Sequence, residues 1–435
     1  MGHGKAIFYS LIFLFLIPFS LYGKNNYNFD FITKGKQDGN TLLVVGGIQG
    51  DEPGGFIAAS LLATHYTITK GSVWVVPNLN FYSIIKRCRG PYGDMNRKFA
   101  YLSKNDPEYK TVEKIKRYIN DENVKLIVNL HDGSGFYRKK YMDSMHSPYR
   151  WGQSSVIDQV SLDGIKYGNL KEISSEVINH VNNHLIREED RYHTHNTKTR
   201  EGDKEMEKSL TYYAINQGKA AFGDEATKNQ PTHRRVYYHI LALEKYMEIM
   251  GIEFKRDFKL TPKGVYNAIN NDICISLYDG KIKLPLSKIR KTLKYFPVKK
   301  DSKIEFKANN PLTTIIKKGD TYIIQYGNRR LSRLKADYIQ YDDITKTVKL
   351  QIDGKLQDVK FGSVVDVKDN FLVKADNGYR INVIGYTNKN KKETDIKITH
   401  FQIPRRFSID KNGNTYRIEY YNKEKFAGMI LVNFN

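Results

Sequence analysis

Three side chains of types that bind metal ions lie at the ends of apolar, strand-like runs. Gln49 and Glu52 are three positions apart in the glycine-rich segment 46–55, which follows the apolar run 42–46 and opens a helical pattern. His131 directly follows another apolar run. Because ligands of α/β proteins bind at the carboxyl ends of parallel strands, we expect these side chains to meet at one point. Three protein ligands that leave a fourth position open to water describe a catalytic zinc site.

Segment 46–55 has a simpler interpretation, a tight strand-to-helix turn whose glycines serve only the backbone. Its combination with His131 favours the metal site.

The pattern resembles the M14 family of zinc carboxypeptidases, which has a strand, an HxxE-type pair, a helix and a distant histidine at a strand end. Gln49 stands where that family has histidine. An amide oxygen is a weaker zinc ligand than imidazole, so Gln49 could lower the affinity or change the metal.

In having glutamine where the family has histidine, the chain is similar to the periplasmic peptidoglycan D,L-carboxypeptidases that set helical cell shape in curved bacteria. The chain resembles these enzymes over its whole length. The resemblance implies hydrolysis of the γ-D-Glu–meso-diaminopimelate bond, which shortens the tripeptide stems of muropeptides to dipeptides. Peptidoglycan muropeptides are therefore the expected partners, and other cell-wall shape proteins are candidate partners of the two β domains described below.

The resemblance also implies a clamp for the substrate's terminal carboxylate. The family uses an Asn-Arg pair and an upstream Arg. Asn96 and Arg97 match the pair and Arg89 matches the upstream residue, with Arg87 as the alternative. A guanidinium binds a carboxylate through two hydrogen bonds and keeps its charge, so the clamp would restrict cleavage to chain ends.

The family's general base is a Glu late in the catalytic domain, and the matching residue here is Glu225, with the adjacent Asp224 as the alternative. Such a base takes a proton from the attacking water and gives it to the leaving amine. Trp151 is expected to wall the substrate pocket, or else to lie in the core. Four other histidines are expected to do no metal chemistry: His180, His184, His193 and His195.

The elements that position these residues follow from hydrophobic patterning. Between about residues 27 and 250, apolar strand-like runs alternate with helical patterns, which predicts an α/β domain with a mostly parallel, mixed sheet of the M14 carboxypeptidase type. Pro53 suits the first turn of a helix, where no amide donor is needed. The predicted strands are 42–46, 73–77 and 125–130, and the predicted helices are 53–62, 170–186 and 235–250.

Beyond about residue 255, short alternating runs separated by turns predict two small all-β domains, the first barrel-like and the second immunoglobulin-like. Hairpin-type turns are predicted at Asp279-Gly280, Asp353-Gly354, Asn377-Gly378 and Asn412-Gly413. The expected order is a signal peptide (1–23), the zinc carboxypeptidase domain (24–252), the barrel-like domain (253–342) and a β-sandwich (343–435).

Residues 1–23 combine Lys5 with the apolar run 6–20, which is typical of a secretory signal peptide. The run is too short to span a bilayer comfortably. The alternative is an uncleaved membrane anchor, because the cleavage site lacks small residues at both key positions. The sequence therefore predicts an exported, periplasmic protein.

The composition limits the class of protein. A hydrophobic content of 40%, with 31 Tyr and 21 Phe, excludes disorder for most of the 435 residues. The formal charge of +23 favours a polyanionic partner or reflects a lysine-rich proteome. No nucleic-acid recognition motif is present, so nucleic acid is not expected as a partner.

Cys88 and Cys274 form no disulfide framework and are expected to be free thiols, with one interdomain bridge as the alternative.

Two other functions fit parts of the pattern. A deacylase of the desuccinylase or aspartoacylase type has a similar GGxxGDEP-like ligand segment, but a signal peptide and two β domains do not suit a cytosolic metabolite enzyme. A non-catalytic wall-binding scaffold would explain the loss of a histidine at Gln49. The presence of Glu225 and of the Asn96-Arg97 pair favours an enzyme.

Overall fold

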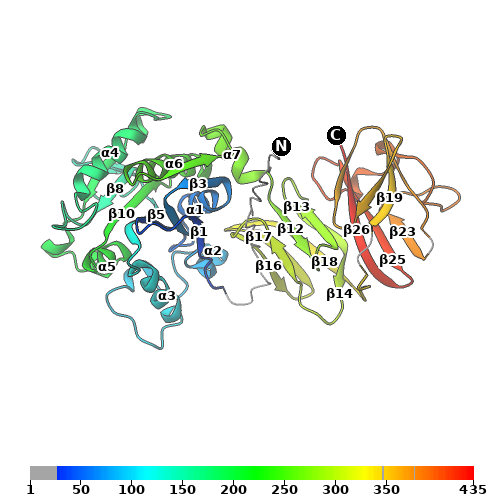
Figure 1. Ribbon diagram of the computed structural model, residues 1–435, viewed down its shortest axis with the longest axis horizontal. Helices are drawn as coiled ribbons and strands as arrows, with labels where there is room; N and C mark the ends of the chain where they lie inside the picture. Colours follow the sequence, from blue (N-terminus) through cyan, green and yellow to red (C-terminus); the bar gives the residue numbers. More distant parts are fainter. Residues whose placement is uncertain (1–26, 345–346, 377) are drawn as a thin grey trace, which may run out of the picture.

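The computed structural model describes residues 27–344, 347–376 and 378–435. The proposed signal peptide, residues 1–23, lies outside the described residues. Three parts follow one another along the molecule: an α/β domain, a small β domain and a C-terminal β domain (Figure 1). Within the described part of the chain, no helix is long and apolar enough to cross a membrane.

A seven-stranded sheet forms the centre of the α/β domain. Its strands, in order across the sheet, are β1 (Ile32–Gly35), β4 (Ser72–Val76), β2 (Thr41–Val45), β5 (Val124–Gly133), β10 (Ala220–Thr227), β8 (Ser154–Ile157) and β9 (His193–Asn196). The four strands β4, β2, β5 and β10 run parallel, whereas β1 is antiparallel to β4 and β8 is antiparallel to β10. The edge strand β9 runs parallel to β8. The predicted mostly parallel, mixed sheet is confirmed.

Helices cover both faces of this sheet (Figure 1). On one face, α1 (Pro53–His65), α4 (Leu170–Asn182) and α6 (Thr232–Ile249) pack together. On the other face, α3 (Tyr109–Ile119) and α5 (Leu210–Asn216) contact the central strands. Strands buried on both sides read as continuous apolar runs, which is why the sequence located them well.

The α/β domain extends beyond residue 252, where we expected it to end. Strand β11 (Glu253–Arg256) pairs with β3 (Tyr66–Lys70), and α7 (Pro262–Asn270) packs against α6. The short strand β11 resembles the β modules in sequence, but its partner strand belongs to the α/β domain. The boundary therefore lies near residue 270.

Two sheets form the barrel domain. One contains β12 (Cys274–Leu277), β13 (Ile282–Pro285) and β15 (Phe306–Ala308). The other has the strand order β14-β18-β17-β16, with β14 (Thr292–Lys299), β16 (Thr313–Lys318), β17 (Thr321–Tyr326) and β18 (Arg329–Ile339). The predicted hairpin at Asp279-Gly280 connects β12 and β13, and both residues have positive φ angles.

The C-terminal domain is a sandwich of two four-stranded sheets around its own hydrophobic core. One sheet has the order β20-β19-β22-β24, with β19 (Thr347–Ile352), β20 (Lys355–Lys360), β22 (Asn370–Val373) and β24 (Ile398–Thr399). The other has the order β21-β26-β25-β23, with β21 (Val364–Val367), β23 (Tyr379–Val383), β25 (Thr415–Asn422) and β26 (Lys425–Phe434).

Of the turns predicted here, Asp353-Gly354 connects β19 and β20 as expected. The prediction for Asn412-Gly413 was wrong, because this pair lies in the loop before β25 and joins no paired strands. The carboxylate of Asp410 holds that loop by accepting hydrogen bonds from successive backbone amides. Residue 377, part of the remaining predicted turn, lies outside the described residues.

The barrel domain shares one continuous hydrophobic core with the α/β domain. Gly327 lies against Phe56 of α1 so closely that an added Cβ would come within 2.8 Å of the ring. Ser60 of α1 donates a 3.0 Å hydrogen bond to Asn310. Gln325 donates to the carbonyl of Ile85 in α2 (Phe81–Lys86), the helix before the Arg89 loop. The barrel therefore supports elements that carry the candidate site.

Candidate active site

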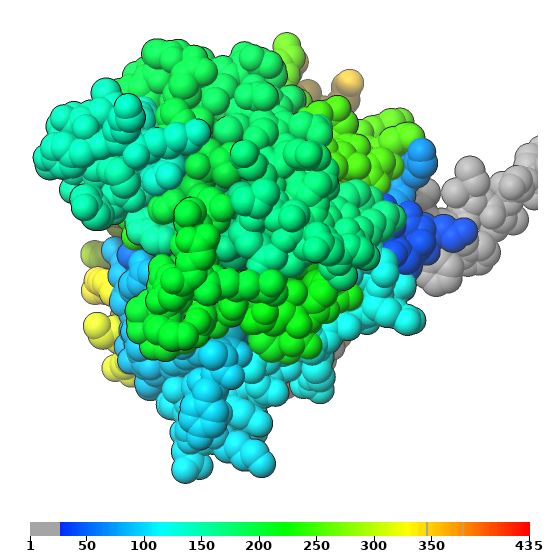
Figure 2. All heavy atoms as spheres, turned by 90° about the vertical axis from the view of Figure 1, so that its left-hand side faces the viewer, coloured from blue at the N-terminus to red at the C-terminus, as the bar shows by residue number. Residues whose placement is uncertain are grey.

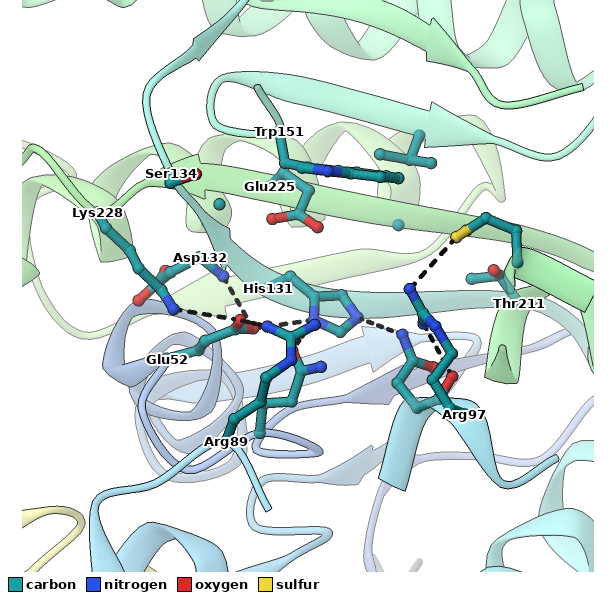
Figure 3. A pocket seen from close by; sticks show the side chains of 16 residues that line it. Glu52, Arg89, Arg97, His131, Asp132, Ser134, Trp151, Thr211, Glu225 and Lys228 are labelled. Carbon is teal, nitrogen blue, oxygen red and sulfur yellow. Dashed lines mark hydrogen bonds and ion pairs between the residues drawn. The ribbon is translucent and has the colours of Figure 1, made fainter. Parts of the chain in front are cut away.

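A cavity of about 250 Å³ opens where β2, β5 and β10 end. All eight residues predicted for the site line it: Gln49, Glu52, Arg89, Asn96, Arg97, His131, Trp151 and Glu225. Figure 3 shows side chains from these separate segments pointing into one space. Figure 2 views the molecule from the end formed by the α/β domain.

Three buried side chains bring possible metal donors together. Nδ1 of His131 lies 2.9 Å from Oε2 of Glu52 and 3.1 Å from Oε1 of Gln49. The amide nitrogen of Gln49 donates a 2.8 Å hydrogen bond to Asp94. Because Asp94 holds the nitrogen, the amide oxygen of Gln49 must face the other two donors.

The ring of His131 is held on its other side by Asn129, whose side-chain amide lies 2.8 Å from Nε2. The buried oxygen Oδ1 of Asn129 has no hydrogen-bond partner. Exchange of the amide nitrogen and oxygen of Asn129 would let that oxygen accept a hydrogen bond from Nε2–H of His131. Nδ1 of His131 would then carry a free lone pair directed toward Gln49 and Glu52, which is what a metal ligand requires.

These three residues fit a metal ion. No group of three His, Cys, Asp or Glu side chains within the described residues is arranged to hold a metal. The amide oxygen of Gln49 is therefore needed to complete a three-donor set. One imidazole nitrogen and two oxygens suit zinc, which binds both donor types.

The turn that carries Gln49 and Glu52 is fixed by close packing and by a buried charge network. Gly50 packs so tightly that an added Cβ would lie 2.0 Å from the backbone of Ser83. At the start of α1, Asp132 accepts a 2.8 Å hydrogen bond from the amide of Gly54. The ligand turn cannot shift without disturbing these contacts.

Asp132 belongs to a network beneath the cavity that connects β5, β10 and α6. Arg235 donates a 2.8 Å hydrogen bond to Asp132, and His239 lies between the carboxylates of Asp132 and Asp224. Burial favours a lower pKa for His239, but its hydrogen bonds to both carboxylates raise the pKa to about 9. A charged His239 thus holds the two strand ends against α6.

Glu225 is the carboxylate placed for general-base chemistry. It is paired in register with His131 on the neighbouring strand, so both side chains point to the same side of the sheet. Burial raises the pKa of Glu225 above its usual range, while His131 opposes the shift. A divalent cation at the nearby donors would lower this pKa again. Asp224 points to the opposite face, toward His239, and does not line the cavity.

The carboxylate clamp is built from two segments. Arg89 donates to Asp94 at 3.0 Å and lies 3.5 Å from Glu52, with half of its side chain exposed. Asn96 accepts a 3.0 Å hydrogen bond from the backbone amide of Leu210, which turns its side-chain amide nitrogen toward the cavity, 3.5 Å from Nε2 of His131. The alternative clamp residue, Arg87, ends α2 with its side chain exposed and does not line the cavity.

Arg97 is the cation best placed to receive an anion. Its guanidinium donates to the carbonyl of Asn96 at 3.1 Å and contacts the sulfur of Met206. Among the described residues its one carboxylate partner is Glu205, at 3.7 Å and largely exposed. Arg97 is thus held in place by neutral groups while its charge remains available.

Trp151 forms the upper wall of the cavity in Figure 3. Its indole lies against His195, with ring centres 4.7 Å apart, and His195 stacks on Tyr137 at 4.0 Å. Burial lowers the pKa of His195 to about 4, so this histidine is neutral. His195 therefore supports the pocket wall and, as expected, is not placed as a metal ligand.

The cavity also contains residues that sequence reasoning missed. The ammonium of Lys228 lies 2.7 Å from Asp51 and 3.5 Å from Glu52. It follows β10 directly, at the strand end that carries Glu225, and that position was the available signal. The other missed lining residues are Asp132, Gly133, Ser134, Val156, Met206, Thr211 and Gly223.

The remaining expectations concern residues outside the cavity. The rings of His180 and His184 contact each other in and just beyond α4, and within the described residues they belong to no group of three metal-binding side chains. Cys88 and Cys274 are both free thiols.

Comparison with known families gives three consecutive matches. Residues 7–270 match the catalytic part of the carboxypeptidases controlling helical cell shape. Residues 272–340 match the β-barrel domain of the same carboxypeptidases, and residues 341–435 match a C-terminal domain of metallo-carboxypeptidase. A search of curated proteins found no match.

Solved structures of the cell shape determinant protein Csd4 from Helicobacter pylori are similar over nearly the whole chain. The tripeptide-bound structure is 42% identical, with a TM-score of 0.85 over 94% of this chain and 100% of that one. The structure of its mDAP-bound form, described as a D,L-carboxypeptidase, is 43% identical, with a TM-score of 0.84 over 93% and 100%. With the three matches along the sequence, this shows that the chain belongs to the family of metallo-carboxypeptidases that control helical cell shape.

Proposed function

We propose that the protein is a zinc-dependent D,L-carboxypeptidase that removes terminal meso-diaminopimelate from the tripeptide stems of peptidoglycan, leaving dipeptides. One observation carries this proposal. A metal-donor set, a buried carboxylate and a guanidinium available for an anion surround a single cavity. The relative that matches 94% of the chain was solved with a tripeptide bound.

Each part of the cavity has a role in peptide-bond hydrolysis. Zinc held by Gln49, Glu52 and His131 would supply Lewis-acid activation of water and of the scissile carbonyl. Glu225 takes a proton from the attacking water, whose oxygen forms the new bond to the carbonyl carbon. When the carbon–nitrogen bond breaks, Glu225 returns that proton to the leaving amine.

The clamp explains why cleavage would occur at chain ends. Arg97 lies on the far side of His131 from Lys228 (Figure 3), and Asn96 and Arg89 also line the cavity as donors for a carboxylate. Charge-assisted, two-point hydrogen bonding fixes both the position and the orientation of that carboxylate. An internal peptide bond has no such group, so it would not be held in this way.

We also propose that the protein acts in the periplasm, where its substrate polymer lies. Support comes from the basic start and short apolar run of residues 1–23. The deacylase and scaffold alternatives are less well supported. A deacylase does not account for the two β domains, and a scaffold does not account for the alignment of Glu225 with His131.

The experiment is a digest of muramyl tripeptide by the zinc-loaded protein, followed by mass spectrometry. We expect muramyl dipeptide and free meso-diaminopimelate, and about one zinc per chain by elemental analysis. Failure to release meso-diaminopimelate from the zinc-loaded protein would reject the substrate. Zinc that remains after Glu52→Ala and His131→Ala are combined would place the metal elsewhere.

A further inference from the structure

The barrel domain carries a disproportionate share of the positive charge. Residues 272–340 contain sixteen Lys and Arg against six Asp and Glu, a net charge of +10 out of +23 in less than a sixth of the chain. Within the described residues, no ion pair joins any of these sixteen cations to a carboxylate. By contrast, Arg89 and Lys228 at the active site are each paired with acids. Twelve of the sixteen cations are exposed, and none of the sixteen is compensated by an ion pair in the part of the chain that the structure describes.

Strand pairing places several of these cations on one face of the sheet β14-β18-β17-β16. Lys318, Thr321 and Lys335 are partners in register across β16, β17 and β18, so their side chains project from the same face. Arg333 lies two residues before Lys335 and therefore shares that face. Directly paired side chains in a sheet lie about 5 Å apart, and next-but-one residues about 7 Å.

Strand β14 adds no cation with a defined place on this face. Thr292 pairs with Arg333, and the register then shifts between Leu293 and Phe296, so Lys294 has no paired residue on β18. Lys291 precedes Thr292 and lies outside the strand. We call the exposed cations on the shared face the basic face: Lys318, Arg333 and Lys335.

Such an arrangement is unfavourable on its own. Arg333 and Lys335 are about 7 Å apart, which is within the Debye length of about 8 Å at physiological ionic strength, so these two cations repel each other. Lys318 lies roughly 10 Å from Lys335, with Thr321 between them. Two carboxylates are near in the chain, Asp320 in the turn before β17 and Asp337 on β18, but neither forms an ion pair within the described structure. A bound polyanion would relieve this repulsion.

The chemistry of the face favours a polymer with carboxylates over a lipid surface. Faces that dock on membranes insert Trp, Phe or Leu beside their cations. In the barrel domain the exposed large apolar side chains are two tyrosines, Tyr295 and Tyr338. Several exposed cations on one face of a sheet suit an extended chain of anionic groups.

We propose that the basic face binds the carboxylate-bearing peptidoglycan polymer and thereby holds the catalytic cavity close to its peptide stems. The identity of this polymer rests on the proposed function, since the stems that await trimming are themselves rich in carboxylates. Once the basic face has bound the polymer, the cavity can meet neighbouring stems without a new diffusional encounter. The effective concentration of stems at the cavity is therefore raised. The basic face would thus add affinity for the polymer without taking part in the chemistry.

The test compares two variants that remove the same charge. The first combines Lys318→Gln, Arg333→Gln and Lys335→Gln. The control combines Lys355→Gln, Lys360→Gln and Lys368→Gln on the exposed surface of the C-terminal domain. Binding of zinc-loaded protein to isolated peptidoglycan sacculi is measured by co-sedimentation, with native sacculi and with sacculi whose carboxylates have been amidated.

We expect the first variant to bind native sacculi about tenfold more weakly than wild type, because each exposed ionic contact contributes modestly. The control should change binding less than twofold, and amidated sacculi should bind all three proteins equally weakly. Equal losses in the two variants would overturn the proposal. The proposal would also be overturned if the first variant lost binding only to vesicles of anionic phospholipid and bound native sacculi as wild type does.

The same proteins are assayed on soluble muramyl tripeptide, and this separates the proposal from the proposed function. Both variants should cleave it at the wild-type rate, because neither alters the cavity. If no protein cleaves muramyl tripeptide, the proposed activity fails while the sedimentation result still decides the role of the basic face. A selective loss of cleavage in the first variant would overturn the docking role.

Discussion

The active-site cavity and the basic face of the barrel use charge in opposite ways. In the cavity, Glu52, Arg89, Lys228 and Asp132 are buried or partly buried, and each has a partner of opposite charge. On the basic face, the cations are exposed and have none within the described residues. Buried, paired charges are fixed in position, and removal of one partner has a large free-energy cost. Exposed charges contribute additively to the attraction of a ligand and are screened by salt. Substitutions in the two regions should therefore differ in size, additivity and salt dependence.

The largest effect is expected at Glu225. Glu225→Gln keeps the shape of the side chain but cannot accept a proton, so turnover of muramyl tripeptide should fall by about 10²–10⁴. The fold, zinc content and substrate affinity should be kept, as measured by circular dichroism, elemental analysis and calorimetry. Asp224→Asn is the matched control on the opposite face of the same strand, and it should lower thermal stability more than turnover. A normal rate for Glu225→Gln would remove it as the base.

A strong, non-additive effect is expected at Arg97. Arg97→Ala should lower kcat/KM for muramyl tripeptide by roughly 10², because a charge-assisted hydrogen-bond pair is lost. Amidation of the substrate's terminal carboxylate should harm the wild type by a similar factor and the variant little further, since both changes remove one interaction. Additive losses would show that Arg97 contacts another part of the substrate.

A smaller change is expected when the unusual ligand is replaced. Gln49→His should bind zinc as tightly as wild type, or up to roughly tenfold more tightly, because imidazole is the better zinc ligand and Asp94 can accept its N–H. Competition with a chromophoric chelator measures this, with Gln49→Ala as the weak-binding control. A folded Gln49→His protein that binds no zinc would mean that Gln49 is not a ligand.

The smallest expected effect is that of salt on catalysis, and it distinguishes the cavity from the basic face without any substitution. Raising the ionic strength from 0.05 to 0.5 M should change kcat/KM on soluble muramyl tripeptide by less than about threefold, because partly buried charges are weakly screened. Binding to sacculi should fall much more steeply over the same range. Equal salt dependence in the two assays would abolish the distinction between cavity and basic face.

The sequence predicted the central strands and the ligand segments well for a physical reason. Parallel strands buried on both faces appear as uninterrupted apolar runs, and the residues at their carboxyl ends are then easily located. It favoured Glu225 over Asp224 by resemblance alone, because the physical difference between them is the face of β10 that each residue occupies. Pairing with β5 and the hydrogen bond between Asp224 and His239 show which face that is.

Other features depend on contacts between distant segments. Lys228 was missed because a single lysine carries little information in a chain with 70 Lys and Arg residues. The boundary near residue 270 was missed because β11 joins a strand almost two hundred positions earlier. The wrong prediction of a hairpin at Asn412-Gly413 has a local cause. The carboxylate of Asp410 accepts the hydrogen bonds of the loop amides, which in a hairpin would be satisfied by a paired strand.

The shared core of the α/β domain and the barrel has a consequence for how the chain is made. Helix α1 is apolar around most of its circumference, and nearly all of its residues are buried. The backbone of Gly327, which covers Phe56, leaves the ribosome about 270 residues after it. Until then α1 has an uncovered hydrophobic side, a state prone to aggregation. A fragment ending at residue 270 should therefore be insoluble, whereas one ending at residue 342 keeps the cover of α1 and should be more soluble. That longer fragment should still be less stable than the full chain, because Tyr421, Phe426 and Leu431 of the sandwich belong to the shared core.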